Sequence, residues 1–208
     1  MTFPHLKVTY FDFPGRGEPI RLALVIAGIP FDDDRVQRDT WPVVQKTLPF
    51  YQVPTLAIDG HVFGESSAIL RYVGALGGLY PTTNLVDALR VDEICSYKVE
   101  LVDHLIPSFK ESDPEKKKAM REALLPDLRD MLGLLEARLA AVSTPKGPWF
   151  LDTVSIADLL VYEAVLTFRV GFVDHIPTDI CDGFPRMMAI FHAVQSHPKV
   201  VAWYEAQK

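Results

Sequence analysis

The pattern of hydrophobic positions changes near residue 80. Before this point, short runs typical of β-strands alternate with stretches in which apolar residues recur at helical spacing. After it, almost every apolar position follows the helical period. The change predicts an α/β half followed by an all-helical half.

The first part of the α/β half reads as a strand, a helix and a second strand. Residues 6–10 are typical of a short strand, and 19–27 carry apolar residues at helical spacing. Gly28 follows, where a helix end favours a residue that tolerates positive φ. A second strand is expected to begin within 29–32, which completes a βαβ unit.

A hairpin and a helix are expected to complete this half. The apolar runs 55–58 and 61–63 flank Asp59-Gly60, and this dipeptide is a strong signal for a two-residue hairpin turn. A helix follows, with Ser66 as its expected N-cap. The order predicts a small mixed sheet covered by helices, a βαβ unit followed by ββα.

The second half is expected to contain only helices. We place a first domain at 1–80, a linker at 81–87 and an all-helical domain at 88–208. The motif Ser155 to Asp158 resembles a capping box, which would start a buried helix and do no chemistry. Two helical faces support the assignment. They comprise Val91, Ile94, Lys98, Leu101 and Leu105, and Met120, Leu124, Leu128, Met131, Leu132, Leu135 and Leu139.

Composition and charge restrict the choice of partners. The chain has 208 residues, of which 49% are hydrophobic and 23% charged, which fits a globular protein and excludes a disordered one. With 21 Lys and Arg against 27 Asp and Glu, the net charge is −6. Binding to nucleic-acid phosphates needs clustered cations, and the densest charged run, 109–122, mixes both signs. We therefore expect no nucleic-acid partner.

Cysteine usage and hydropathy indicate a cytosolic protein. Cys95 and Cys181 stand alone, without a CxxC pair or a disulfide framework. The first residues show no apolar signal sequence. The most apolar stretch, 151–173, is interrupted by charged residues, so we expect a buried helix there and no membrane span.

Several common enzyme motifs are missing from the sequence. It contains no Walker motif, no GxGxxG and no HExxH. The six histidines are scattered, and no Cys/His group has the spacing of metal ligands. We therefore expect no metal site and no bound cofactor.

The remaining motifs point to one family. They are Thr9-Tyr10-Phe11, Gly15-Arg16-Gly17-Glu18, Trp41-Pro42, the run 48–54 (LPFYQVP) and Glu65-Ser66-Ser67-Ala68-Ile69, with Ser155 to Asp158 and Phe184-Pro185 in the helical half. In this order and spacing the sequence resembles the cytosolic glutathione transferases over essentially its whole length. It is most similar to the sigma class, with the alpha, mu and pi classes as near relatives.

The resemblance implies a fold and a reaction. The fold is a thioredoxin-like N-terminal domain and an all-helical C-terminal domain, in a homodimer with active sites near the interface. The reaction is conjugation of glutathione, a co-substrate, to hydrophobic electrophiles. Tyr10 matches the residue whose hydroxyl hydrogen-bonds the glutathione sulfur, and Arg16 matches an arginine near the mouth of the electrophile pocket. Arg16 equally fits a surface ion pair with Glu18 or Asp12.

Known magnitudes make one hydroxyl nearly sufficient for this role. A thiol with a pKa of about 8.5 is only a few per cent ionised at pH 7. Lowering this pKa by about two units takes about 2.7 kcal/mol. A hydrogen bond to a charged group supplies about 1.5–3 kcal/mol.

The resemblance also implies contacts to the rest of glutathione. Val53 and the cis Pro54 would present backbone groups to the cysteinyl unit. Glu65 and Ser66 would bind the γ-glutamyl end, Ser66 through a helix N-terminus. Glu100 matches a carboxylate that reaches the γ-glutamyl ammonium from the neighbouring subunit, and it also fits a plain surface residue.

Two further regions follow from the same resemblance. Trp41 and Gln52 would surround the glycyl end, where relatives often place a lysine. This sequence has Gln45 at the aligned position, followed by Lys46, so either side chain could make the contact. The electrophile pocket would be lined by Phe11, Phe13, Pro14, His104, Pro107 and Ser108.

Three functions stay compatible with these residues. The leading one is glutathione transferase. The second is a glutathione-dependent isomerase of the prostaglandin type, or a peroxidase, which would use the same thiolate on another substrate. The third is a non-catalytic homologue similar to lens crystallins, because retained binding residues do not establish turnover.

Overall fold

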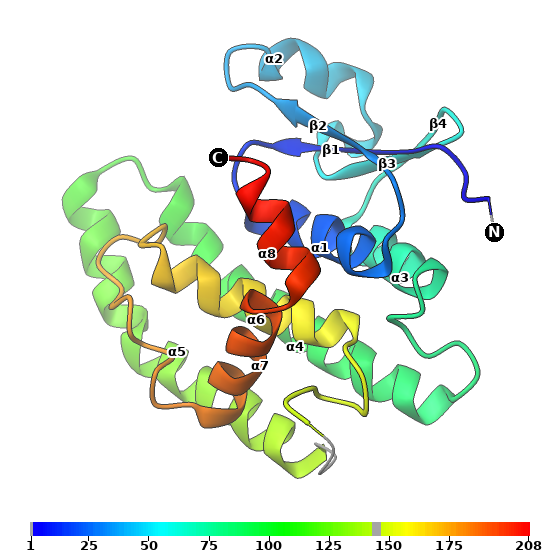
Figure 1. Cartoon of the computed structure of the whole chain (residues 1–208). Coiled ribbons are helices and arrows are strands. Elements are labelled where there is room, and N and C mark those ends of the chain that lie inside the picture. The colour runs from blue at the N-terminus through cyan, green and yellow to red at the C-terminus, as the bar shows by residue number, and fades with distance from the viewer. Residues whose placement is uncertain (1, 143–146) are drawn as a thin grey trace. The chain divides into compact units, whose positions relative to one another are not determined.

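The computed structural model describes residues 2–142 and 147–208 (Figure 1). Its strands are β1 (Leu6–Phe11), β2 (Asp32–Val36), β3 (Thr55–Ile58) and β4 (His61–Phe63). Its α-helices are α1 (Glu18–Ala27), α2 (Trp41–Val44), α3 (Ser66–Leu76), α4 (Leu85–Lys110), α5 (Pro114–Val142), α6 (Ile156–Arg169), α7 (Pro185–Gln195) and α8 (Pro198–Glu205). Three short 3₁₀ turns, Gly15–Gly17, Gln45–Thr47 and Pro49–Tyr51, lie in the first half.

The chain divides into two compact units. One is Met1–Leu85 together with Ser196–Lys208, and the other is Val86–Gln195. The C-terminal helix α8 therefore packs with the α/β unit, on α1. This differs from the predicted helical domain of 88–208, because helical periodicity does not reveal which unit the last helix joins.

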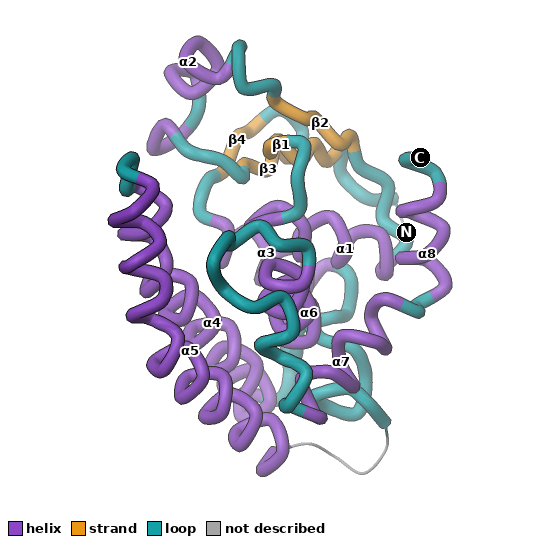
Figure 2. The backbone as a smooth tube through the Cα atoms, turned by 90° about the vertical axis from the view of Figure 1, so that its left-hand side faces the viewer, coloured by secondary structure: helices purple, strands orange, loops and turns teal. Residues whose placement is uncertain are grey.

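A four-stranded mixed sheet forms the centre of the α/β unit. The strand order is β2-β1-β3-β4, with β1 parallel to β2 and antiparallel to β3. Helices α1 and α3 pack against each other on one side of the sheet, while α2 lies on the other side (Figures 1 and 2). This is the thioredoxin-like arrangement that the sequence predicted.

Local signals placed several elements correctly. The hairpin strands β3 and β4 have the predicted bounds, and the turn residues Asp59 and Gly60 both have positive φ, 48° and 88°. Gly28 ends α1 in the left-handed conformation, with φ 71°. These positions depend on backbone preferences that a few neighbouring residues determine.

Strand β2 begins at Asp32, within the predicted range 29–32 and after Pro30, which has no N–H to donate to a ladder. Two other boundaries differ from the prediction. Ser66 is the first residue of α3 and not its N-cap; Glu65 takes that position, with φ 69°. Helix α4 begins at Leu85, inside the segment 81–87 that we had expected to be a linker.

In the helical unit, α4 and α5 are linked by side-chain contacts. The Tyr97 hydroxyl donates to the Met131 carbonyl oxygen at 3.1 Å, and Arg138 pairs with Glu93 at 2.7 Å. The predicted face of α4 is buried in full, and on α5 four leucines of the predicted stripe are buried: Leu128, Leu132, Leu135 and Leu139. The three remaining members of that stripe, Met120, Leu124 and Met131, are half-buried.

The capping box at the start of α6 is present as predicted. Asp158 is fully buried, and its carboxylate accepts hydrogen bonds at 2.8 Å from the Phe150 N–H, the Ser155 N–H and the Ser155 hydroxyl. Burial raises the pKa of Asp158 to about 6, although the hydrogen bonds oppose the rise. The carboxylate thus satisfies buried donors in the loop before α6.

Replacing Asp158 by alanine should destabilise the fold. Two buried N–H groups would lose their acceptor, at about 1–3 kcal/mol each. We expect a loss of roughly 2–5 kcal/mol in the free energy of unfolding, measured by urea denaturation. Asp130→Ala, which changes an exposed aspartate on α5, is the control and should stay within about 0.5 kcal/mol of wild type. Equal effects of the two substitutions would contradict this role for Asp158.

Candidate active site

The sheet register brings the predicted glutathione-binding residues of the α/β unit together where β1 ends. We call this end of the strands the sheet edge. Thr9 and Thr55 form the last pair of the antiparallel ladder, and Tyr10 and Pro54 are the next residues along their chains. Strand β4 runs antiparallel to β3, so α3 and its first residue, Ser66, begin at the same edge. Since β2 is parallel to β1, its end leads there as well, and α2 with Trp41 follows.

Tyr10 is buried at this edge, and its hydroxyl group is hydrogen-bonded. Its side chain is only 6% exposed, and its hydroxyl oxygen accepts a hydrogen bond from the Arg16 backbone N–H at 3.1 Å. Because the oxygen is the acceptor in this bond, the hydroxyl proton is suited to donate to a further acceptor. An accepted hydrogen bond also polarises the O–H group and strengthens it as a donor.

Two glycines allow the chain to turn this close to the phenol. A Cβ atom at Gly15 would lie 2.6 Å from the Tyr10 hydroxyl oxygen, and Gly15 has φ 43°. A Cβ atom at Gly17 would lie 2.4 Å from the Tyr10 ring. Any larger residue at Gly15 or Gly17 would therefore clash with Tyr10, the candidate catalytic residue.

Aromatic side chains cluster beside Tyr10. The Phe13 ring packs on Tyr10 and the Phe11 ring packs on Trp41, with ring centroids 5.5 and 5.1 Å apart. A hollow of about 330 Å³ is lined by Phe11, Phe13, Trp41 and Arg38. Phe11, Phe13 and Pro14, predicted for the electrophile pocket, are all half-buried. Arg38 was not predicted from the sequence.

The other predicted glutathione contacts surround the sheet edge. The Val53-Pro54 peptide bond is cis, as predicted. Glu65 is exposed, and Ser66 is half-buried at the first position of α3. Of the predicted glycyl contacts, Gln45 is half-buried in a 3₁₀ turn, while Lys46 and Gln52 are exposed.

Four predicted residues belong to α4 of the helical unit. Glu100, His104 and Pro107 are exposed, and His104 Nδ1 lies 2.9 Å from the Glu100 carbonyl oxygen. Ser108 is completely buried instead. Its hydroxyl donates to the Leu105 carbonyl oxygen and accepts from Arg121 Nε, so its polar contacts are made inside this unit.

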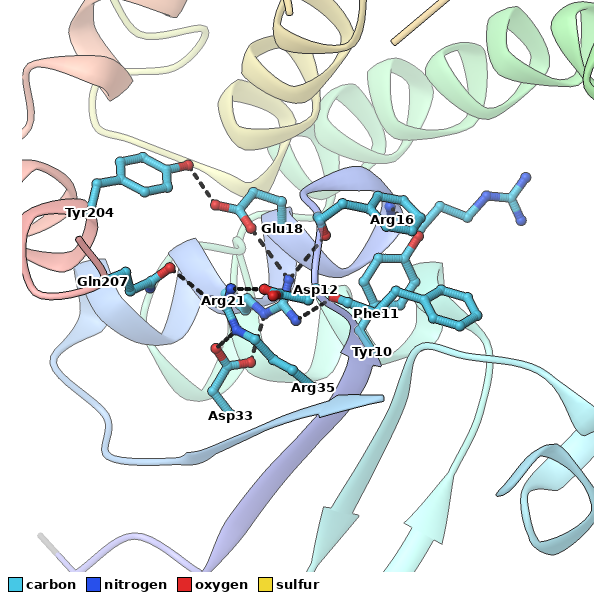
Figure 3. A network of polar contacts seen from close by, with 11 residues as sticks. Tyr10, Phe11, Asp12, Arg16, Glu18, Arg21, Asp33, Arg35, Tyr204 and Gln207 are labelled. Carbon is cyan, nitrogen blue, oxygen red and sulfur yellow. Dashed lines mark hydrogen bonds and ion pairs between the residues drawn. The ribbon is translucent and has the colours of Figure 1, made fainter. Parts of the chain in front are cut away.

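Arg16 does not make the surface ion pairs that we had considered from the sequence. Glu18 is only 3% exposed and pairs with Arg21, while Asp12 pairs with Arg35. The Arg16 side chain is exposed and extends away from these carboxylates (Figure 3). Sequence reasoning overlooked Arg21, although its spacing of three residues from Glu18 on a helix signals such a pair.

Further properties concern metals, membranes and thiols. Within residues 2–142 and 147–208, no group of three or more His, Cys, Asp or Glu residues is arranged to hold a metal ion. None of the described helices is long and apolar enough to cross a membrane. Cys95 and Cys181 are buried free thiols, and burial raises the pKa of Cys181 to about 12.

Comparison with known proteins identifies the family. Residues 6–75 match the glutathione S-transferase N-terminal domain, and residues 100–207 match the C-terminal domain of the same family. The chain is 31% identical to glutathione S-transferase 1 of Ascaris suum, covering 96% of this chain and 95% of that protein.

Solved structures give the same result. The prostaglandin synthase D of Nilaparvata lugens matches with a TM-score of 0.84 at 30% identity, covering 99% of both chains. A monomeric glutathione transferase from the hookworm Necator americanus matches with a TM-score of 0.80 at 31% identity, covering 98% of both chains. The chain therefore belongs to the glutathione S-transferase family.

Proposed function

We propose that the protein is a cytosolic glutathione transferase that activates glutathione as a thiolate and conjugates it to hydrophobic electrophiles. One observation carries the proposal: the Tyr10 hydroxyl accepts a hydrogen bond from the Arg16 backbone N–H. It does so at the edge of the sheet that also holds the cis Val53-Pro54 peptide bond. In this reading, the Tyr10 hydroxyl donates a hydrogen bond to the glutathione sulfur. The bond favours the thiolate over the thiol and so lowers the thiol pKa.

The tripeptide is bound in parts by different segments of the sheet edge. The Val53 backbone pairs with the cysteinyl unit, just before the ladder begins at Thr55. The first turn of α3 offers backbone N–H groups, and with them the Ser66 hydroxyl, to the γ-glutamyl carboxylate. Glu65 accepts from the γ-glutamyl ammonium, and Glu100 does so from a partner subunit.

The glycyl end meets residues of α2 and the turn that follows it. We propose that the Trp41 indole and Gln52 border it, and that Gln45 or Lys46 binds its carboxylate. Lys46 would bind the carboxylate more strongly than Gln45, because a hydrogen bond from a charged donor is stronger than one from a neutral donor. The electrophile would then lie against Phe11, Phe13 and Pro14, which are half-buried beside Tyr10.

A second candidate is a glutathione-dependent isomerase of the prostaglandin type. The structural likeness to the prostaglandin synthase D of Nilaparvata lugens favours it. Both reactions need the same thiolate, so the two candidates share the Tyr10 chemistry and differ in the electrophile. Turnover of an aromatic halide, compared with turnover of a prostaglandin endoperoxide, separates them, and binding of glutathione without either reaction would indicate a non-catalytic homologue.

Replacing Tyr10 by phenylalanine should deactivate bound glutathione without releasing it. The pKa of the bound thiol should rise by about one to two units, given the 1.5–3 kcal/mol of such a bond. The conjugation rate at neutral pH should fall roughly tenfold to a hundredfold, and higher pH should restore part of it. The thiolate absorbance of the binary complex, titrated against pH, measures the shift.

Tyr97→Phe is the matched control for Tyr10→Phe. It also removes a hydroxyl that forms a hydrogen bond, here to the Met131 carbonyl oxygen inside the helical unit. Its titration curve should coincide with that of wild type. If the Tyr10→Phe curve coincides as well, Tyr10 does not activate the thiol.

Replacing Ser66 by alanine should weaken binding more than chemistry. The γ-glutamyl carboxylate is remote from sulfur and keeps its charge during the reaction, so KM should rise with little change in kcat. A charge-assisted hydrogen bond of about 1.5–3 kcal/mol corresponds to a loss of roughly tenfold to a hundredfold in affinity. Calorimetric titration with glutathione tests this, with Ser67→Ala, at the neighbouring exposed serine, as the control. If Ser66→Ala binds glutathione with the wild-type affinity, Ser66 does not contact the γ-glutamyl carboxylate.

We further propose a homodimer in which Phe50 is an anchor. The Phe50 side chain is 69% exposed and Tyr51 is 65% exposed, although both are aromatic. Both also have positive φ, 55° and 54°, which is costly for bulky residues. A strained, exposed aromatic pair is compatible with a role outside the single chain.

Sedimentation tests the assembly. The wild-type protein should sediment as a dimer at micromolar concentration, whereas Phe50→Ala should dissociate at least tenfold more readily, since a buried aromatic anchor contributes about 2 kcal/mol or more. Val43→Ala, at an aliphatic residue with 72% exposure on α2, is the control. A wild-type species near 23.4 kDa would contradict the dimer, and an intact Phe50→Ala dimer would contradict the anchor.

A further inference from the structure

Two arginines hold the segment that follows Tyr10. Arg21 Nη2 donates to the Phe11 carbonyl oxygen at 3.0 Å and Arg21 Nη1 donates to the Phe13 carbonyl oxygen at 3.3 Å. Arg35 Nη1 donates to the carboxylate of Asp12, which stands between them. The three residues after Tyr10 are therefore each tied to a guanidinium group.

The C-terminal segment contacts Arg35 directly and reaches Arg21 through Glu18. The Tyr204 hydroxyl donates to Glu18 Oε1, and Glu18 Oε2 lies 3.5 Å from Arg21 Nη1. Arg35 Nη2 donates to Gln207 Oε1 at 2.8 Å. These contacts join residues that are 186 and 172 positions apart in the sequence.

The network is continuous from α8 to the catalytic phenol. Asp33 joins the two arginines, since its oxygens accept from Arg21 Nε at 2.7 Å and from Arg35 Nε at 2.8 Å. The Arg21 guanidinium carbon lies 5.6 Å from the centroid of the Tyr10 ring. Figure 3 shows the path from Tyr204 through Glu18 and Arg21 toward Tyr10.

Burial makes the Tyr204 contact important. Glu18 and Arg21 are 3% and 1% exposed, so water cannot replace a lost partner. Burial raises the pKa of Glu18, while the hydrogen bond from Tyr204 and the charge of Arg21 oppose the rise. Removing the Tyr204 hydroxyl would favour the neutral carboxyl form and so weaken the counter-charge that holds Arg21 in place.

We propose that Tyr204 is a positioning residue for Tyr10, acting through Glu18 and Arg21, so that the C-terminal segment determines where the phenol meets the thiol. The inference rests on the proposed function. Tyr204 itself does not touch the reacting atoms. Its role is to keep the Glu18 and Arg21 pair intact and thereby the backbone from Phe11 to Phe13, next to Tyr10.

The test compares two substitutions on α8. Tyr204→Phe deletes only the hydroxyl that bonds Glu18. Lys199→Met is the matched control, because Lys199 Nζ also joins α8 to α1, but at the other end, where it donates to the Ile26 carbonyl oxygen at 2.7 Å. If α8 mattered only for packing, the two variants would behave alike.

The expected result is specific to the thiol. In Tyr204→Phe, the pKa of bound glutathione should rise by about 0.5–1 unit, and kcat measured below that pKa should fall by the corresponding factor of roughly three to ten, a size typical of coupling through a side-chain network. KM for glutathione should stay within about twofold, since no substrate contact is removed. Lys199→Met should leave the thiol pKa at its wild-type value.

A second pair of variants tests the route. In a Glu18→Gln background, Tyr204→Phe should add no further shift of the thiol pKa, because both changes interrupt the same path. The inference is overturned if Tyr204→Phe leaves the thiol pKa unchanged, if Lys199→Met shifts it equally, or if the two changes at Glu18 and Tyr204 are additive. A wild-type protein that does not lower the thiol pKa would instead contradict the proposed function.

Discussion

The hydrogen bond between the Arg16 backbone N–H and the Tyr10 hydroxyl is the constraint on which the rest of the site depends. For this bond to form, the chain must leave β1 and turn back at once toward the Tyr10 side chain near the end of that strand. Only glycine fits at positions 15 and 17 during this return, because a Cβ atom would overlap Tyr10 at either one. The turn then leads directly into α1, whose first residue, Glu18, belongs to the buried charge network.

The same constraint explains why charges are buried next to the sheet. After Tyr10, the carbonyl groups of Phe11 and Phe13 both accept hydrogen bonds from the Arg21 guanidinium. A buried guanidinium needs carboxylates, which Glu18 and Asp33 supply. The C-terminal segment completes the network through Tyr204 and Gln207.

The sequence predicted those parts of the structure that depend on neighbouring residues. The turn at Asp59-Gly60, the left-handed Gly28 and the capping box before α6 were all placed correctly. The motifs around Tyr10 also identified the family, and the sheet register brings their positions to one edge. Strand β2 also begins within the range 29–32 that the sequence predicted.

The long-range contacts could not be predicted in this way. Nothing near Tyr204 in the sequence indicates that its partner is Glu18, and helical periodicity did not reveal that α8 joins the α/β unit. Ser66 looked like an N-cap because serine favours that position, whereas the backbone turns one residue earlier, at Glu65. Contacts of this kind follow from the complete fold and not from local propensity.

All of the proposed chemistry requires that the site at the end of β1 ionises glutathione. Titrating the thiolate absorbance of glutathione bound to the wild-type protein against pH tests whether it does. We predict a bound thiol pKa roughly one to two units below the value of about 8.5 for an ordinary cysteine thiol. A bound thiol that titrates at its ordinary pKa would contradict it.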